Sequence, residues 1–249
     1  DFKLLSSDGG SLKSELPLLA AGDDASASAK SRLPIALVSQ NLWCHYLQSW
    51  YTPSAPKRIS GFLKCVKGED VDVVAVQEIF LIRFGPFAHC RNFELLADGM
   101  RAMGYRHFTD PRPSLPFFGQ NSGLAVFSRH PFVAPPAEAR FRLTGERVCA
   151  KGYVHVRVRP PGFGRPLHVV TTHFDSKTKP KGVRESQAGQ IMRDVVEPIL
   201  AADGEGAVVV AGDFNVCSRG TKDDGSAYGA LKKAMAPLRD LYDGPPEAV

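Results

Sequence analysis

The stretch GAVVVAGDFNV, residues 206–216, places a carboxylate and a carboxamide two residues apart at the end of an apolar run. A run of small and β-branched residues is typical of a β-strand that is buried on both faces. Asp213 and Asn215 follow the run, separated by Phe214. Alternate residues of an extended segment point the same way, so both polar side chains can face one ligand. Gly212 gives the backbone room to turn, and this strand end is a candidate site as well as an ordinary turn.

Three other apolar runs also end in polar residues of types that chemistry uses. Asn41 follows residues 35–39, Glu78 follows residues 71–77, and His173 follows residues 167–172. Each has a plain structural explanation, because asparagine is common in turns and a lone histidine is usually a hydrogen-bonded structural residue. Carboxylates are rarely buried without a partner, so Glu78 is harder to explain in this way. Ligands of open α/β folds bind beyond the ends of strands, and together these residues indicate such a site.

The donor groups at these strand ends favour a hard metal ion. Oxygen ligands without cysteine suit Mg²⁺, Mn²⁺ or Ca²⁺ rather than a structural zinc ion. We predict that Glu78 holds the ion, with Asn41 nearby, and that the ion polarises a phosphoryl oxygen. Asp213 then takes a proton from the attacking water, and Asn215 orients that water or the phosphate. His173 donates to the charge that develops on the phosphoryl oxygens.

Composition sets wide limits on the function. The 249 residues are 43% hydrophobic, which suits one large domain or two small ones. The formal net charge of +5 fits a phosphate-bearing or anionic partner and fits an ordinary soluble protein equally well. No apolar run reaches the roughly 18 residues needed to span a bilayer. Five dispersed cysteines without a CxxC pair argue against a disulfide framework and a structural zinc site. The chain begins at Asp1 and shows no signal peptide, so its compartment cannot be read.

The order of expected elements predicts one α/β domain. Residues 6–32 are rich in Ser, Ala, Gly and Asp, and we expect a poorly ordered N-terminal arm over residues 1–32. Residues 33–249 form the domain. Apolar residues at helical spacing predict four helices, the third of which is kinked or ended by Pro198. The segments concerned are residues 54–68, 92–104, 182–200 and 226–236. Strands between them predict two packed sheets with helices outside.

The motifs at the strand ends resemble those of the endonuclease/exonuclease/phosphatase superfamily of metal-dependent phosphodiesterases. The series is SQNLW, VVAVQEIF, SGLAVFSRHPF, VVTTHFDS and VVVAGDFN. The similarity runs from about residue 33 to residue 242, and the motifs are specific as a set. The resemblance implies an α/β four-layer sandwich of two packed β-sheets flanked by helices. It also implies metal binding by Asn41 and Glu78, water activation and phosphate handling by Asp213 and Asn215, and transition-state stabilisation by His173.

Within the superfamily, the chain is most similar to the neutral sphingomyelinases. The similarity rests on CAKGYVHVRV, RPLHVVTTHFDS and RESQAGQI. It implies Mg²⁺-dependent hydrolysis of sphingomyelin, with Mn²⁺ as a possible substitute, and a phospholipid substrate at a membrane surface. Lys151 is a candidate substrate-binding residue, because its ammonium group can act as a point charge beside a phosphate; a solvated lysine is the alternative. We expect Arg184 and Gln187 to pin a helix to the sheet rather than to act in catalysis.

Other functions on the same scaffold stay open. One is a nuclease or phosphoinositide phosphatase, although nucleic acid fits less well because Leu42 and Trp43 follow Asn41 where repair endonucleases have a Gly-bearing stretch. Another is a non-catalytic domain that binds lipid or a protein partner. Two aromatic segments, residues 79–87 and 114–120, fit either apolar loops at the rim of the site or core packing.

One motif of the superfamily is not found in this sequence. The pattern ends in Ser/Gly-Asp-His on a late strand, whereas His173 is the last histidine here and nothing after Asn215 supplies the motif. We expect a domain that is truncated at its C-terminus and whose longer form is active. The competing explanation is a natural relative that has lost the catalytic histidine.

Overall fold

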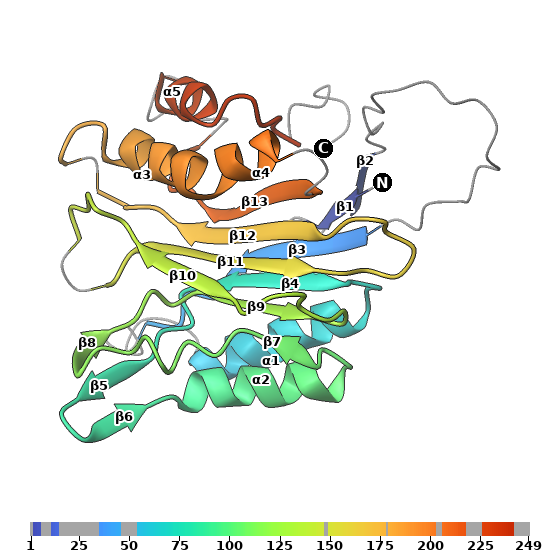
Figure 1. The fold of residues 1–249 in the computed structure, drawn as a ribbon. Helices are drawn as coiled ribbons and strands as arrows, with labels where there is room; N and C mark the ends of the chain where they lie inside the picture. The colour runs from blue at the N-terminus through green and yellow to red at the C-terminus, as the bar shows by residue number, and fades with distance from the viewer. Residues whose placement is uncertain are drawn as a thin grey trace.

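The structure is a computed structural model that describes most of the chain. The described residues are 2–5, 11–14, 35–45, 54–146, 149–177, 179–202, 206–217 and 226–241. They form two large β-sheets packed face to face, with helices on the outer face of each sheet, as Figure 1 shows. The predicted α/β sandwich of two packed sheets flanked by helices is therefore confirmed.

The first large sheet contains the strands that end in Asn41 and Glu78. Its order is β2-β1-β3-β4-β9-β7. The strands are β1 (Phe2–Leu5), β2 (Ser11–Ser14), β3 (Ile35–Asn41), β4 (Val73–Gln77), β7 (His107–Phe108) and β9 (Ala125–Ser128). Strands β3 and β4 are parallel, so their carboxyl ends lie at one edge. Within the arm expected over residues 1–32, β1 and β2 are strands, and β1 pairs with β3. The remainder of that segment lies outside the described residues.

The second large sheet carries the other two site strands. Its order is β10-β11-β12-β13, formed by β10 (Ala137–Arg140), β11 (Gly152–Val158), β12 (Leu167–His173) and β13 (Ala207–Asp213). Strands β12 and β13 are parallel, and their register pairs His173 with Asp213. A small third sheet, in the order β6-β5-β8, contains β5 (Ile82–Phe84), β6 (Phe87–His89) and β8 (Phe118–Gln120).

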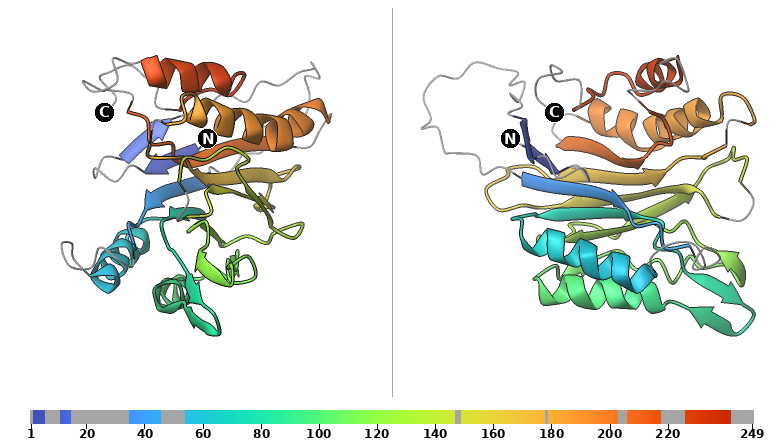
Figure 2. Two further views of the ribbon diagram at one scale, coloured as in Figure 1. Left: turned by 90° about the vertical axis from the view of Figure 1, so that its left-hand side faces the viewer. Right: turned by 180° about the vertical axis from the view of Figure 1, so that it is seen from behind.

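The helices cover the outer faces of the two large sheets, as both views in Figure 2 show. Helices α1 (Ala55–Lys67) and α2 (Arg91–Ala102) cover the first sheet. The second is covered by α3 (Val183–Ile191), the π-helical η1 (Met192–Val196), α4 (Glu197–Ala201) and α5 (Ser226–Ala234). The π turn between α3 and α4 ends two residues before Pro198, the residue predicted to kink or end the helix. Proline has no N–H, and its ring clashes with the carbonyl of Asp194 four residues earlier, so the π turn accommodates it.

An apolar layer holds the two sheets together, and one polar bridge crosses it close to the site. Leu37, Val73, Val126, Val156 and Val169 are among the buried residues of this layer. The bridge is the buried side chain of Gln77, whose Nε2 donates to Ser39 Oγ at 3.2 Å and to Thr171 Oγ1 at 3.0 Å. Ser39 and Thr171 belong to different sheets, so the bridge ties the two sheets together one residue before Glu78.

Two further expectations concern the chain as a whole. The five cysteines are free thiols. Of the helices that the structure describes, none has both the length and the apolar character that crossing a bilayer requires.

Candidate active site

Asn41, Glu78, His173 and Asp213 meet where the carboxyl ends of both sheets come together. The amide nitrogen Nδ2 of Asn41 donates to Glu78 Oε1 and to Asp213 Oδ2, each at 2.9 Å. Asn41 and Asp213 are 172 residues apart in sequence, and the packing of the two sheets brings them together. The imidazole Nε2 of His173 lies 3.7 Å from Glu78 Oε1 and 3.8 Å from Asp213 Oδ2. The four strand ends singled out in the sequence therefore converge.

The amide group of Asn41 has a definite orientation. Its Oδ1 accepts a hydrogen bond from the N–H of Trp43 at 2.8 Å, which turns Nδ2 toward the two carboxylates. Donation to two carboxylates satisfies both amide hydrogens. Oδ1 is the atom of Asn41 that could bind a cation, and it has a second lone pair besides the one that accepts from Trp43.

Glu78 is buried, yet its surroundings favour the ionised form. Burial alone raises the pKa of this carboxyl, but its interactions with His45 and Asn41 outweigh burial and lower the pKa. His45 Nε2 lies 2.8 Å from Glu78 Oε2. The sequence did not single out His45, because it lies in a segment without periodicity or motif. Its role follows only from the contact with Glu78.

His173 is held neutral at the base of the site. Burial and the positive charge of Lys151 lower the pKa of its imidazole by more than the nearby carboxylates raise it. Its Nδ1 is buried and has no hydrogen-bond partner among the residues that the structure describes. A neutral imidazole carries one N–H and one lone pair, so His173 can donate to a ligand or bind a metal ion.

Asp213 and Lys151 are positioned through Asn215 and the backbone of Phe174. The N–H of Asn215 donates to Asp213 Oδ1, and its Nδ2 donates to the carbonyl oxygen of Phe174, both at 2.8 Å. Lys151 Nζ donates to the same carbonyl at 3.2 Å and lies 3.6 Å from Glu146 Oε2. Lys151 is only 3% exposed, so the alternative of a solvated surface lysine is wrong. The structure thus brings all six residues of the predicted site into one neighbourhood.

Residues 38–226 match the model of the Endonuclease/Exonuclease/phosphatase family. This chain belongs to that family. A comparison with curated proteins gave no match. The family is named after enzymes that hydrolyse phosphate esters, which agrees with a site built from carboxylates, an amide and an imidazole.

Solved structures of the same fold include three bacterial proteins. SmcL is 20% identical with a TM-score of 0.61, over 82% of this chain and 71% of SmcL. A mutant of beta toxin from Staphylococcus aureus with bound magnesium ions is 17% identical with a TM-score of 0.63, over 80% of this chain and 69% of the toxin. Sphingomyelinase C from Streptomyces griseocarneus is 19% identical with a TM-score of 0.56, over 80% of this chain and 68% of that enzyme. At these identities the likeness shows a shared fold.

The donor groups of this family member suit a divalent cation. One ligand atom each from Glu78, His173 and Asp213 lies within 4.8 Å of the others. Ligands that sit about 2.0–2.6 Å from a hard cation can have such separations. Two carboxylates in one cavity also repel each other unless a cation or a proton lies nearby. The residues present therefore fit a metal ion, and His173 lies at ligand distance in addition to its predicted role toward phosphate.

Backbone strain is concentrated at this site. Trp43, Glu78 and Asn215 have φ angles of 50°, 59° and 51°, and among the described residues they are the non-glycine residues with positive φ. Such conformations are uncommon outside glycine and tend to gather at functional sites. The positive φ of Glu78 ends β4 at the preceding residue. The direction of the Glu78 side chain is therefore not set by the alternation of side chains along the strand.

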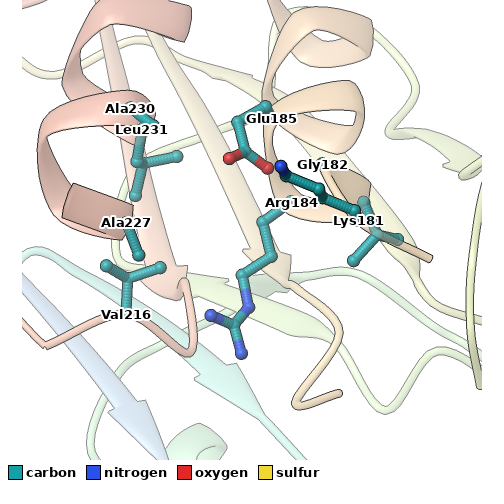
Figure 3. Close-up of a pocket in the computed structure, with 9 residues that line it drawn as sticks. Lys181, Gly182, Arg184, Glu185, Val216, Ala227, Ala230 and Leu231 are labelled. Atoms are coloured by element: carbon teal, nitrogen blue, oxygen red, sulfur yellow. The ribbon is translucent and has the colours of Figure 1, made fainter. Parts of the chain in front are cut away.

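Arg184 and Gln187 hold α3 against the segment that follows His173. Arg184 Nε donates to the carbonyl oxygen of Asp175 at 2.9 Å, and Gln187 Nε2 donates to Asp175 Oδ1 at 3.0 Å. Their predicted role in pinning a helix agrees with these contacts. A hollow of about 330 Å³ lies beside them, between the start of α3 and α5, and Arg184, Glu185, Val216 and Leu231 help to line it (Figure 3). None of the predicted site residues lines this hollow.

Proposed function

We propose that this chain carries the site of a Mg²⁺-dependent phosphodiesterase that hydrolyses sphingomyelin to ceramide and phosphocholine. The observation that carries the proposal is the junction of Asn41, Glu78 and Asp213 through two hydrogen bonds of 2.9 Å, with His173 beside them. Magnesium bound in the structurally similar beta toxin supports the choice of metal ion. The likeness to a sphingomyelinase C, together with the motif around Lys151, supports the choice of substrate.

Glu78 and Asn41 are the residues that we propose hold the metal ion. When bound, Mg²⁺ supplies Lewis-acid polarisation of a phosphoryl oxygen. The lowered pKa of Glu78 keeps its carboxylate charged at neutral pH, which a cation ligand requires. His45 orients this carboxylate from the side opposite Asn41, because it contacts Oε2 whereas Asn41 contacts Oε1.

Asp213 is the proposed proton acceptor for the attacking water. Asn41 holds its Oδ2 and the N–H of Asn215 holds its Oδ1, so the carboxylate is oriented before the substrate arrives. Neutral His173 presents an N–H to a phosphoryl oxygen. Lys151 places a positive charge near the site. Its Nζ and Asn215 Nδ2 donate to the same carbonyl oxygen, that of Phe174. Each group placed in this way typically contributes about 10²–10⁴ in rate.

The second candidate is a nuclease or phosphoinositide phosphatase on the same site. The family match favours it, because the family includes endonucleases and phosphatases. Asn41, Glu78, His173 and Asp213 could act on any phosphate ester. Substrate specificity therefore depends on the surfaces around the site.

An assay with three substrates separates these functions. The protein is incubated with sphingomyelin vesicles, an abasic-site DNA duplex and a phosphoinositide, each with Mg²⁺ and with EDTA. We expect phosphocholine release that EDTA abolishes. Preferential cleavage of the duplex or of the phosphoinositide would refute the sphingomyelin proposal. Absence of turnover on all three, with Mg²⁺ shown to bind, would indicate a non-catalytic relative.

A further inference from the structure

Four phenylalanine side chains stand in solvent at the small third sheet. Phe84, Phe87, Phe117 and Phe118 are 62%, 79%, 59% and 68% exposed. We call these four residues the aromatic tip. The apolar run that leads into it behaves differently, because residues 79–81 are buried. One continuous apolar segment therefore supplies the core in its first part and the solvent-facing surface in its second.

The backbone holds the aromatic tip in a single row. The antiparallel registers pair Phe84 with Phe87 on one side and with Phe118 on the other. Residues directly opposite each other in a sheet project from the same face, so these three rings lie side by side. Phe117 meets Phe118 edge-on, with ring centroids 4.8 Å apart. The row is therefore preorganised and does not form only on binding.

A two-residue hairpin turn sets the end of the row. Gly85 has a φ of +58°, which glycine adopts readily, and Pro86 completes the turn between β5 and β6. The N–H of Gly85 donates to the carbonyl oxygen of Phe117 at 3.1 Å. This bond ties the turn to the segment before β8, so the four rings move together.

The charges near the aromatic tip fit an anionic or zwitterionic surface. Residues 79–93 and 111–123, which contain the three strands, hold no aspartate or glutamate. Arg83 precedes Phe84 on β5, with its side chain on the opposite face of the small sheet, and exposed Arg91 follows β6. Aromatic rings flanked by arginine suit the headgroup region of a phospholipid bilayer, where rings enter the interface and guanidinium groups meet phosphates.

The aromatic tip lies on the same side of the molecule as the site. Strand β5 begins four residues after Glu78. In Figure 1 the small sheet projects at the lower left, the side toward which the carboxyl ends of β3, β4, β12 and β13 point. A flat surface in contact with the tip is therefore on the side from which the site takes its substrate.

We propose that the aromatic tip docks the protein on a phospholipid bilayer by inserting its rings at the level of the headgroups. The inference rests on the proposed function in one respect, namely that the docked protein hydrolyses a lipid phosphodiester of the same bilayer. Docking itself requires neither the metal ion nor turnover.

Vesicle binding in EDTA tests the docking separately from catalysis. The double variant Phe84→Ser/Phe87→Ser is compared with wild type by co-sedimentation with vesicles of phosphatidylcholine, sphingomyelin and phosphatidylserine. Leu200→Ser is the matched control, because Leu200 is 50% exposed on α4, on the far side of the second sheet. We expect wild type and Leu200→Ser to bind alike. The double variant should lose at least about tenfold in partition coefficient, since it lacks two rings that insert into the bilayer in the proposed docked state. Phe84→Leu/Phe87→Leu should restore most of the binding.

Three binding results would overturn the proposal. One is a wild-type protein that stays in solution, and another is a double variant that binds vesicles as wild type does. The third is a wild-type dimer in sedimentation velocity that the double variant dissociates without any change in vesicle binding, which would assign the tip to a second copy of the chain.

Activity measurements keep the two proposals distinguishable. With bis(p-nitrophenyl) phosphate, a water-soluble phosphodiester, the double variant should keep the kcat/KM of wild type, whereas with vesicular sphingomyelin its rate should fall about as far as its binding. Equal loss on both substrates would refute a docking role. A protein that binds vesicles through the tip but turns over neither substrate would refute the proposed function and leave docking supported.

Discussion

At the scale of single residues, the polar groups of the site fix the orientations of one another's side chains. Asn41 holds one oxygen of Glu78 and one of Asp213 with a single amide nitrogen. The N–H of Asn215 donates to the other oxygen of Asp213, and His45 Nε2 lies 2.8 Å from the other oxygen of Glu78. Both carboxylates are therefore placed by their neighbours, and Glu78 and Asn215 have positive φ angles. Preorganisation of this kind removes the need to order the groups when the substrate binds.

Substitutions of the two carboxylates should remove turnover without unfolding the protein. Asp213→Ala deletes the proposed proton acceptor, so we expect kcat to fall by about 10²–10⁴. Glu78→Gln keeps the shape of the side chain but removes the charge that holds the cation. We expect Mg²⁺ to raise the melting temperature of wild type and to leave that of Glu78→Gln unchanged. Asp98→Asn, an exposed carboxylate on α2, is the control for both measurements. An Asp213→Ala protein with wild-type kcat would contradict the assignment.

At the scale of elements, the position of Asp213 depends on how closely β13 approaches β12. Gly212 has a φ of +152°, and a Cβ atom placed on it would lie 2.0 Å from the carbonyl oxygen of Thr172. Only glycine allows the two strands to pair up to their last residues, where His173 and Asp213 stand side by side. The sequence predicts that Gly212 gives the backbone room for a turn. The contact shows that it gives room for strand pairing.

Adding one methyl group at Gly212 should separate these strand ends. In Gly212→Ala the new Cβ atom meets backbone rather than a flexible side chain, so we expect a loss of about 2–4 kcal/mol in unfolding free energy. Activity should fall as well, because Asp213 is displaced. The control is Gly229→Ala in α5, where a Cβ atom meets nothing within 4 Å and helix propensity improves by about 1 kcal/mol. Urea unfolding of both variants measures the difference; equal stabilities would show that β13 can shift freely.

At the scale of the whole molecule, a few polar side chains are packed among the apolar layers of the two sheets, and burial shifts the pKa of some of them. One of these is His155, on the face of β11 that points away from the layer between the sheets. Its ring stacks on that of His168, with centroids 5.2 Å apart. Burial, followed by the charges of His168 and Arg157, lowers the pKa of His155 to about 4. The folded protein therefore keeps this imidazole neutral under mildly acidic conditions.

This histidine should make the fold sensitive to acid. An unfolded chain protonates His155 near pH 6.5, whereas the folded protein does so only near pH 4, so unfolding takes up a proton between these values. Unfolding free energy should fall as the pH drops from 6.5 toward 4, by at most about 3 kcal/mol from this group. His155→Gln should show a smaller fall between pH 7.5 and pH 5 in denaturant titrations. His107→Gln controls for the loss of a histidine elsewhere, and an unchanged pH slope in His155→Gln would contradict the prediction.

Much of the architecture could be read from local patterns. Helical spacing located α1 and α2, the β-branched runs located β4 and β13, and Pro198 marked the break after α3. The residue types at the strand ends indicated hard metal chemistry. These features depend on periodicity and residue chemistry over ten or so neighbours, which the chain displays in its sequence. Strands β1 and β2, which lie in the segment expected to be a poorly ordered arm, lack such a pattern.

The remaining features depend on contacts between distant segments. No local pattern could show that His45 pairs with Glu78, that Gln77 bridges the sheets, or that Lys151 is buried beneath the site. The same limit applies to the aromatic run after Glu78, where Phe80 is buried and Phe84 is exposed although both are phenylalanines four residues apart. Residue chemistry is local and is carried by the sequence itself. Which side chains meet, and which stay in water, follows from sheet register and sheet packing, and these arise only when the whole chain has folded.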